Sequence, residues 1–330
     1  LLRLDLTKVR LDVVHALDAA IGIETTSSIA TRHGGIAAIN VGFFKMTGLH
    51  QGDATSVLKI DGKLLSESYS ERVALGILNK SNLTEIVIGR LNMNVEARFK
   101  NQTRKVSGIN RERRDDELIL FTPEFHRTTL TDSNGLEILV RKEKIVEIRD
   151  AKGSSLIPSD GFVLSASGKQ RLQLLDTVKV GMKVNFNGKL ETGNSADLKY
   201  EKQQNLFSES EDIVDGVPFL IENGKIEITW EREKIGKEFA TTRHPRTAVA
   251  RLKDGKILMA TVDGRQPNIS VGMNLQELAE MLLELGAVEA MNLDGGGSTT
   301  MFLNGKVVNQ PSDKEGERKV AAAILVFPRK

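Results

Sequence analysis

A carboxylate followed by three glycines carries the most chemical information in this chain. Residues 287–293 are largely apolar and predict a buried strand, and Asp294 comes directly after them. Consecutive glycines cost backbone entropy on folding, so a structure keeps them where the chain must approach another group closely or adopt a positive φ. N–H groups exposed in such a turn can bind an anion, and neighbouring hydroxyl groups add donors. An acid beside an anion site indicates catalysis more than storage, and a glycine-rich structural turn is the alternative. This first cluster consists of Asp294, Gly295, Gly296, Gly297, Ser298, Thr299 and Thr300.

A second cluster places two arginines around a histidine. Arg243, His244 and Arg246 surround Pro245 immediately before a predicted strand. The arginine side chain is a planar and permanently charged fork that suits phosphate oxygens, and histidine exchanges a proton near neutral pH. A phosphate site and a basic loop paired with surface acids are both compatible with this pattern.

Asp263 and Arg265 form a third cluster at the end of the next predicted strand. The Asp-Gly pair at residues 254–255 predicts a hairpin that pairs this strand with the one beginning near Arg246. That hairpin would bring the third cluster close to the second. A structural Asp–Arg turn is the alternative.

The fourth cluster follows a predicted buried strand at residues 37–39. Asn40 can hydrogen-bond a sugar hydroxyl, and Phe43 or Phe44 can cover the face of a sugar. Core packing is the alternative for at least one of these rings.

Local patterns predict mostly antiparallel β-structure. Asn-Gly and Asp-Gly pairs between β-prone runs favour two-residue hairpin turns. The clearest helix is predicted at residues 274–285, where Asn274 and Glu277 form a capping box and a glycine ends the helix. A shorter helix is predicted at residues 27–32, and the polar segment 191–210 predicts a mobile surface loop. The turn pairs are Asp61-Gly62, Asn134-Gly135, Asn187-Gly188, Asn223-Gly224, Asp254-Gly255 and Asn304-Gly305.

We therefore expect an α+β fold with mixed, mostly antiparallel sheets and a few helices, in a single catalytic domain over residues 1–330. Residues 1–84 carry the Asn40 motif, residues 85–215 are a β-rich middle segment, and residues 216–330 carry the other motifs. The four clusters are expected to converge on one cleft.

The composition excludes several classes of function. The chain has no cysteine, which rules out disulfides, thiolate catalysis and cysteine-ligated zinc, and its net charge is only +2. No basic stripe interleaved with aromatic residues is present, so nucleic-acid binding is not expected. No apolar stretch approaches the roughly 20 residues needed to span a bilayer. P-loop, G-x-S-x-G and H-E-x-x-H motifs are absent. Asp53 and Asp215 are interpreted as turn acids, which are more often structural than catalytic. The chain begins at Leu1, and we expect an exported protein whose signal segment would precede that residue.

Together the four clusters resemble the phosphodiester glycosidase family. The resemblance is close over residues 239–326 and looser over residues 1–76, and the segment between them resembles a bacterial version of the same domain. The Asn-Leu-Asp-Gly-Gly-Gly-Ser string is specific in this order with the other motifs, whereas no single motif is. The motifs are Asn40-Val41-Gly42-Phe43-Phe44, His244-Pro245-Arg246-Thr247-Ala248, Asp263-Gly264-Arg265 and Asn292-Leu293-Asp294-Gly295-Gly296-Gly297-Ser298.

The resemblance implies a hydrolase that cuts the C1–O bond of a sugar-1-phosphate diester, such as a GlcNAc-1-phosphodiester, and releases free sugar and a phosphomonoester. Asp294 is then the first candidate for the nucleophile or base and Asp263 the second, and His244 is the third catalytic candidate. The candidates for binding the sugar or the phosphate are Asn40, Arg246, Arg265, Asn292, Gly295, Gly296, Gly297, Ser298 and Thr299.

Two other classes of function stay open from the sequence. A non-catalytic module could bind a cell-envelope glycan or teichoic acid. A phosphodiesterase could instead cut the P–O bond with a divalent cation on Asp263 and Asp294. No cofactor is expected otherwise, and the expected partner is a carbohydrate phosphodiester.

Overall fold

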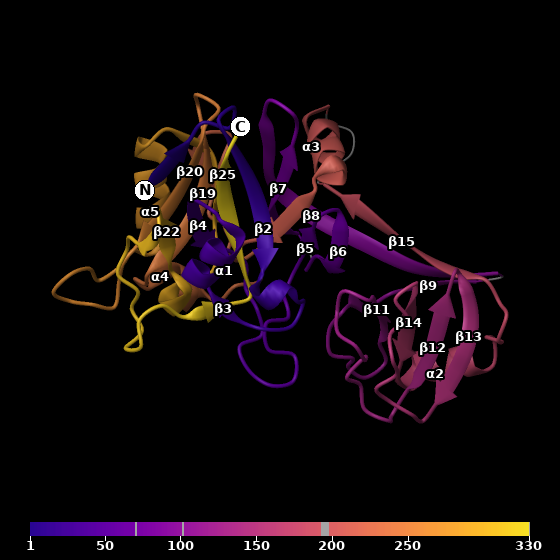
Figure 1. Ribbon diagram of the computed structural model, residues 1–330. Coiled ribbons are helices and arrows are strands. Elements are labelled where there is room, and N and C mark those ends of the chain that lie inside the picture. The colour runs from indigo at the N-terminus through magenta and orange to yellow at the C-terminus, as the bar shows by residue number, and fades with distance from the viewer. Residues whose placement is uncertain (70, 101, 193–197, 330) are drawn as a thin grey trace.

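The computed structural model describes residues 1–69, 71–100, 102–192 and 198–329 (backbone only for residues 198–200). These residues form a broad body and a smaller lobe that stands to one side of it (Figure 1). Strand pairing is almost entirely antiparallel and helices are few, which confirms the expected α+β fold.

Three sheets build most of the body. The first has the strand order β1 (Leu2–Leu4), β20 (Ile257–Val262), β19 (Arg246–Leu252), β21 (Ala287–Asn292), β17 (Phe219–Glu222) and β18 (Lys225–Ile226). The second has the order β2 (Val9–His15), β25 (Ala322–Pro328), β4 (Ala37–Asn40), β22 (Met301–Leu303) and β23 (Lys306–Val307). The third has the order β15 (Val184–Glu191), β8 (Thr84–Phe99), β7 (Arg72–Asn79), β16 (Asp212–Asp215), β5 (Leu58–Ile60) and β6 (Lys63–Ser66), and β9 (Gln102–Lys105) pairs with β8. A short pair, β24 (Lys319–Val320) with β3 (Glu24–Thr25), lies beside them.

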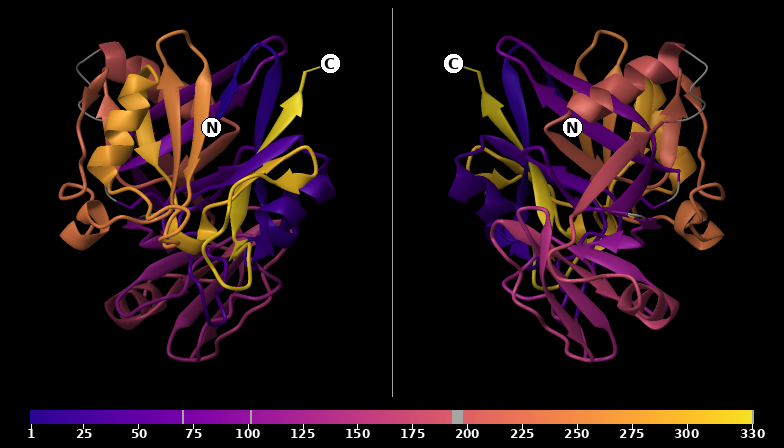
Figure 2. Two further views of the ribbon diagram at one scale, coloured as in Figure 1. Left: turned by 90° about the vertical axis from the view of Figure 1, so that its left-hand side faces the viewer. Right: turned by 90° about the vertical axis from the view of Figure 1, so that its right-hand side faces the viewer.

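The main core lies where the inner faces of these sheets meet. Val249 of β19 and Ile324 of β25 pack there with Leu75 of β7, because alternate residues of a strand point to one face. Helix α5 (Leu275–Glu284) covers the opposite face of the first sheet, and α1 (Thr26–His33) covers that of the second (Figure 2). The body is thus layered, and the ends of β4, β19 and β21 can meet at one place.

The lobe has its own sheet and core. Its strand order is β10 (Gly108–Ile109), β11 (Leu118–Phe121), β14 (Gly161–Ala166), β12 (Leu136–Arg141) and β13 (Lys144–Asp150), and α2 (Gly168–Leu175) follows β14. The long strand β8 joins the lobe to the body, since residues 84–91 pair with β7 and residues 92–99 pair with β15. The lobe lies inside the predicted middle segment 85–215, and the boundaries of that segment stay a prediction.

Most of the local predictions agree with the structure. The predicted helix 274–285 is α5, with the capping box between Asn274 and Glu277 in place. The helix predicted at 27–32 is α1, and Gly34 ends it in the left-handed region at φ 72°. Hairpins form at the turn pairs of residues 61–62, 223–224, 254–255 and 304–305.

Two turn predictions are wrong. Asn187 and Gly188 lie inside β15, opposite Glu96 and Val95 of β8, because pairing along a long neighbouring strand outweighs the local turn preference. The pair at residues 134–135 leads into β12, which pairs with β13 and β14 and not with the preceding strand β11.

The mobile loop predicted at residues 191–210 is also wrong where the structure describes it. Residues Leu198–Glu209 form helix α3, and residues 193–197 lie outside the described part of the chain. Phe207 anchors this helix because its side chain is fully buried against Val87 and Ile213. A single apolar anchor in a polar segment gives little helical periodicity. The short helix α4 (Lys237–Thr241) was not expected either.

None of the helices among the described residues is long and apolar enough to cross a membrane.

Candidate active site

Three strand ends meet at Asp294, as the sequence predicted for their motifs. The Asp294 N–H donates to the carbonyl of Val41, at 3.0 Å, just after β4. Leu293 N–H donates to the carbonyl of Thr247 in β19, at 2.8 Å. The end of β21 is therefore held between β4 and β19. Asp294 thus lies where the first sheet, with β19 and β21, meets the second sheet, with β4.

Asn40 holds this junction together. Its Nδ2 donates to the Asp294 carbonyl at 2.6 Å, and its Oδ1 accepts from Thr247 Oγ1 at 2.8 Å and from Thr300 N–H at 3.1 Å. The side chain is 0% exposed. We therefore expect Asn40 to position the Asp294 loop, whereas the sequence suggested direct contact with the substrate.

Asn292 is buried beside the same loop. Its Nδ2 donates to the carbonyls of Val217 and Leu293, at 2.7 and 2.8 Å. Its Oδ1 is buried and has no hydrogen-bond partner among the described residues. The same is true of the hydroxyl groups of Ser298, Thr299 and Thr300. Buried polar groups are normally paired, so these unpaired atoms make the surroundings of the Asp294 loop a candidate binding place.

The glycines let the chain approach itself closely. A Cβ on Gly295 would lie 2.6 Å from the carbonyl oxygen of Pro245, and one on Gly297 would collide with Arg318 and Asp313. Gly296 N–H donates to the Pro245 carbonyl at 2.9 Å, and Ser298 N–H to the Gly295 carbonyl at 3.1 Å. The backbone cradle predicted for residues 295–298 is thus partly occupied by internal hydrogen bonds.

Positive charge gathers beside this loop, where Arg246, Arg265 and His244 lie together and Glu238 is the acid that acts on His244. Arg246 is 1% exposed, and its guanidinium makes no ion pair within the described part of the chain. Burial and the nearby Arg265 lower the pKa of Arg246 to about 10, so it stays charged at neutral pH. Burial, Arg246 and Arg265 together lower the pKa of His244. Arg246 donates to three backbone carbonyls, and an anionic ligand nearby would offset the buried charge that remains.

Arg265 is the exposed member of this group. Its backbone has φ 59°, in the left-handed region, and such strain in a residue other than glycine is common at functional sites. Its Nη2 lies 3.3 Å from Nδ1 of His244, and its guanidinium covers Gly296, where an added Cβ would be 3.1 Å away. Arg246, Arg265 and His244 are called the cation cluster below.

Asp263 and Arg243 are engaged elsewhere. Asp263 Oδ1 accepts from Asn309 Nδ2 and from Gln310 N–H, both at 3.0 Å, and so ties down the segment after β23. Arg243 pairs with Glu277 at the start of α5. The proposed chemical role of Asp263 stays a prediction, while its contacts in this structure hold the fold.

Asp294 is partly exposed, and its environment favours the neutral form. Burial raises its pKa to about 6, although Ser298, Arg318 and the Gly295 N–H oppose this shift. Arg318 also binds Asp313, with Nε to Oδ2 at 2.7 Å.

Asp215 is the functional candidate that the sequence analysis dismissed. It is 2% exposed, and its Oδ2 has no hydrogen-bond partner in the described part of the chain. Burial raises its pKa to about 7, Arg72 lowers it and the charge of Asp294 raises it. A Cβ on Gly42 would collide with Asp215 Oδ1. Asp215 and Asp294 therefore flank the same short segment, Val41–Gly42, as a pair of carboxyl groups.

Replacing Asp215 by asparagine should stabilise the protein at alkaline pH. Because the folded pKa lies above the ordinary value of 3.8, the contribution of Asp215 to stability is present at low pH and is lost as the pH rises through about 7. The free energy of unfolding of Asp215→Asn relative to wild type should rise between pH 4 and pH 8 by up to roughly 4 kcal/mol. Urea unfolding at several pH values measures this.

The exposed Asp254 supplies the control, since Lys256 lowers its pKa. Asp254→Asn should give a small difference of the opposite sign. A difference for Asp215→Asn that does not change with pH would contradict the buried carboxyl pair.

Metal binding has no assigned ligand set. The residues that the structure describes contain no group of three or more His, Cys, Asp or Glu side chains placed to hold a metal ion.

Comparison with known proteins relates the chain to one family and to solved structures of the same fold. A family model described as "Phosphodiester glycosidase" matches residues 134–327, more than half of the chain. The mouse N-acetylglucosamine-1-phosphodiester alpha-N-acetylglucosaminidase is 32% identical over 166 residues, which cover 48% of this chain and 30% of the mouse protein. The alignment thus spans less than a third of that relative.

Two solved structures share the fold. A hypothetical protein from Synechocystis superposes with a TM-score of 0.82 at 23% identity, covering 97% of this chain and 57% of that one. A protein described as a putative exported protein from Burkholderia pseudomallei gives a TM-score of 0.81 at 24% identity, covering 97% of this chain and 71% of that one.

Proposed function

Because the chain belongs to the phosphodiester glycosidase family, we propose that it hydrolyses a glycosyl phosphodiester between the sugar C1 and the ester oxygen. The family comprises glycosidases that act on phosphodiesters. The observation that supports the proposal is the position of the Asp294 loop beside the cation cluster, where Gly295 lies against the backbone of Arg246 and Gly296 lies against the guanidinium of Arg265.

The cation cluster suits the phosphate. A diester carries one negative charge, and the phosphomonoester that departs gains a second with a pKa of about 6. Arg265 and His244 are accessible enough to contact these oxygens. Arg246 is buried behind them and adds positive charge. Preorganised donors aimed at the developing charge stabilise a transition state. The leaving group therefore needs little protonation.

Asp294 suits the sugar carbon. When the C1–O bond breaks, its electron pair leaves with the phosphate and C1 becomes positive. An ionised Asp294 either attacks C1 or takes a proton from the water that does. Asp215 is the second carboxyl group of this pair, and with a pKa near 7 it carries a proton over part of the neutral range. Asp263 remains the other candidate from the sequence.

Hydrolysis in heavy-oxygen water tests the bond that is cut. With a GlcNAc-1-phosphodiester as substrate, we expect the label in the released sugar and unlabelled phosphomonoester, measured by mass spectrometry. Label in the phosphate would instead show P–O cleavage. Tight binding of the diester without turnover would indicate a non-catalytic glycan-binding module.

Export from the cytoplasm also stays a prediction. The exported description belongs to a relative that shares the fold at 24% identity.

A further inference from the structure

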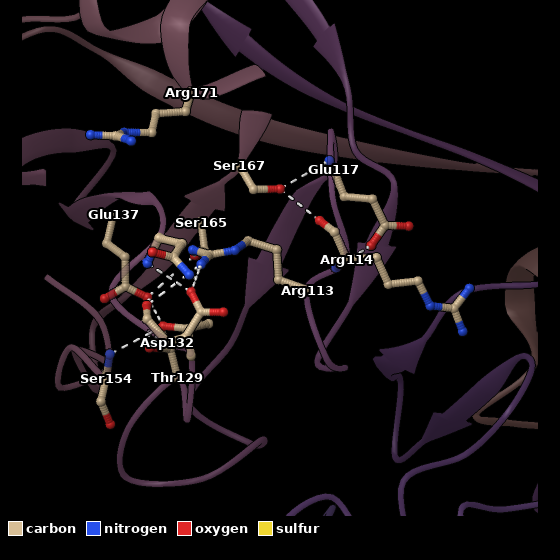
Figure 3. Close-up of polar contacts among 12 residues, drawn as sticks. Arg113, Arg114, Glu117, Thr129, Asp132, Glu137, Ser154, Ser165, Ser167 and Arg171 are labelled. Atoms are coloured by element: carbon tan, nitrogen blue, oxygen red, sulfur yellow. Dashed lines mark hydrogen bonds and ion pairs between the residues drawn. The ribbon is translucent and has the colours of Figure 1, made fainter. Parts of the chain in front are cut away.

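Asp215 differs in its hydrogen bonding from Glu137, a fully buried acid of the lobe. Glu137 accepts from the hydroxyl groups of Thr129 and Thr131, each at 2.7 Å (Figure 3). Its other oxygen accepts from Ser155 N–H at 2.9 Å. Asp215 is 2% exposed, yet its Oδ2 has no partner among the described residues. Buried acids that serve the fold are normally paired on both oxygens, so Asp215 is a candidate for a further role.

Arg72 lies beside Asp215 in the third sheet. Asp215 of β16 is directly opposite Ala74 of β7, and alternate residues of a strand point to one face. Arg72 is therefore a diagonal neighbour of Asp215 on the same face of the sheet, within reach of a long side chain. The charge of Arg72 lowers the pKa of Asp215.

The ring of Tyr69 holds the guanidinium of Arg72. The guanidinium carbon lies 4.7 Å from the ring centre, and Nζ of Lys234 lies 5.8 Å from the same ring. The Arg72 N–H donates to the Tyr69 carbonyl at 3.2 Å. Nε of Arg72 is buried and has no hydrogen-bond partner in the described part of the chain. Packing on the ring therefore fixes where this positive charge lies.

Arg72 and Tyr69 line a large cleft between the body and the lobe. Its volume is about 1070 Å³, and residues of both parts of the molecule line it. Phe43, a further lining residue, follows Gly42, where an added Cβ would lie 2.2 Å from Asp215 Oδ1. Arg72 is partly exposed here, whereas Asp215 is buried. The arginine thus connects an open surface with a buried carboxyl group.

The two charged groups that act most strongly on Asp215 have opposite effects. Arg72 lowers its pKa and the charge of Asp294 raises it, while the backbone N–H of Phe43 lowers it as well. Two neighbouring carboxyl groups do not readily ionise together, so the pair carries one negative charge before it carries two. With a pKa of about 6 for Asp294 and about 7 for Asp215, the singly charged state lies between these two values.

We propose that Arg72 is a positioning residue that sets the upper pH limit of the singly charged state of the Asp215–Asp294 pair. The inference rests on the proposed function and concerns the regulation of the same site. In the singly charged state Asp294 is ionised and Asp215 holds its proton. A second negative charge beside the first repels an anionic phosphodiester. The activity should therefore fall above this limit, and Arg72 determines where the fall begins.

Arg72→Gln tests the inference through stability. The free energy of unfolding of Asp215→Asn, relative to the protein that keeps the acid, rises with pH until the folded pKa of Asp215 is passed. With Arg72 present, we expect the rise to end near pH 7. With Arg72→Gln in both proteins, it should continue about one pH unit higher, because a charge that favours the ionised form is missing. Urea unfolding from pH 4 to pH 9 measures both curves.

Arg90→Gln is the matched control. Arg90 lies in the same sheet, opposite Val73, and its guanidinium is 5.0 Å from the centre of the Phe219 ring, but it pairs with Glu222. Its replacement should leave the end of the rise unchanged. Arg72→Lys keeps the charge and should restore most of the wild-type curve.

Tyr69→Leu provides a second route, since it removes the ring that holds Arg72. It should shift the curve in the same direction as Arg72→Gln by a smaller amount. If neither variant shifts the curve relative to wild type, the inference is overturned.

The pH dependence of kcat/KM on a GlcNAc-1-phosphodiester separates the two proposals. We expect the alkaline fall near pH 7 in the wild type and about one unit higher in Arg72→Gln, even if the maximal rate is lower. A shifted stability curve with an unshifted alkaline fall would overturn the regulatory role. A shifted stability curve without hydrolysis of the diester would support the action of Arg72 on the carboxyl pair and refute the proposed hydrolysis.

Discussion

Asp294→Asn should lower kcat on a GlcNAc-1-phosphodiester by about 10³-fold, within the range that one positioned acid or base contributes. The amide keeps the size of the side chain but neither attacks C1 nor stabilises positive charge there. KM should change little, because Arg265 and His244, the proposed phosphate contacts, are unchanged. Steady-state kinetics at pH 7 measures both parameters.

The folded state of this variant should be intact. Because burial raises the pKa of Asp294 to about 6, a neutral amide at this position removes an unfavourable charge at pH 8. The unfolding midpoint of Asp294→Asn at that pH should equal or exceed the wild-type value. Asp254→Asn, at an exposed turn on the far end of the β19–β20 hairpin, serves as the control and should keep full activity. Full activity in Asp294→Asn would remove the central role assigned to this carboxylate.

The sequence predicted that the second and third clusters lie together because a short-range signal, the hairpin turn between their strands, determines it. The hairpin at residues 254–255 places Arg246 opposite Val262, so the second and third clusters had to lie together. The strand before Asp294 follows α5 directly, and its apolar character predicted its place inside the body. The capping box of Asn274 and Glu277 is equally local.

The glycines after Asp294 allow the close approach that the sequence predicted, but the group they approach is the protein itself. Gly295 and Gly297 lie against Pro245 and Arg318 rather than against open space. The backbone N–H groups of residues 295–298 were expected to face a ligand. The N–H group of Gly296 instead donates to the carbonyl of Pro245. A one-dimensional pattern shows that backbone must come close to something, and only the packing shows to what.

The buried environment of Asp215 was not predicted, for a different reason. In sequence it stands in an Asp-Gly-Val-Pro turn, a common structural context. Its environment arises from Gly42, Arg72 and Asp294, which come from three distant segments. The cleft beside the lobe has the same origin, since it depends on how the lobe is set against the body by β8 and β15. Neither feature has a local signature.

Arg246→Lys should reduce the free energy of unfolding by about 3 kcal/mol, the lower part of the range for breaking a buried charged network. Arg246 Nε donates to the Met273 carbonyl at 2.9 Å, and Nη2 donates to the carbonyls of Phe239 and Thr242 at 2.8 and 2.9 Å. A lysine keeps the charge, but its single nitrogen does not reach acceptors on both sides of the guanidinium. At least one carbonyl is then left buried without a donor.

Arg251→Lys is the matched control, on the same strand. Arg251 is partly exposed and pairs with Glu289 at 3.0 Å, so its replacement should cost no more than about 1 kcal/mol. Urea unfolding compares the two variants, and kinetics on the phosphodiester shows the functional part. Equal stability of both variants would contradict the structural role given to Arg246.

The kinetic effect of Arg246→Lys follows from the same contacts. Arg246 holds α4 through Thr242, and its guanidinium stacks on the ring of Phe239, which lines the cleft. It also fixes Met273, which forms a backbone bridge with His244. Loosening these contacts displaces both His244, a proposed phosphate contact, and the ring of Phe239. We therefore expect kcat/KM to fall by about 10²-fold even though the positive charge remains, because small displacements in a site cost that much. A loss of stability with unchanged kcat/KM would limit Arg246 to a structural role and leave the phosphate to Arg265 and His244.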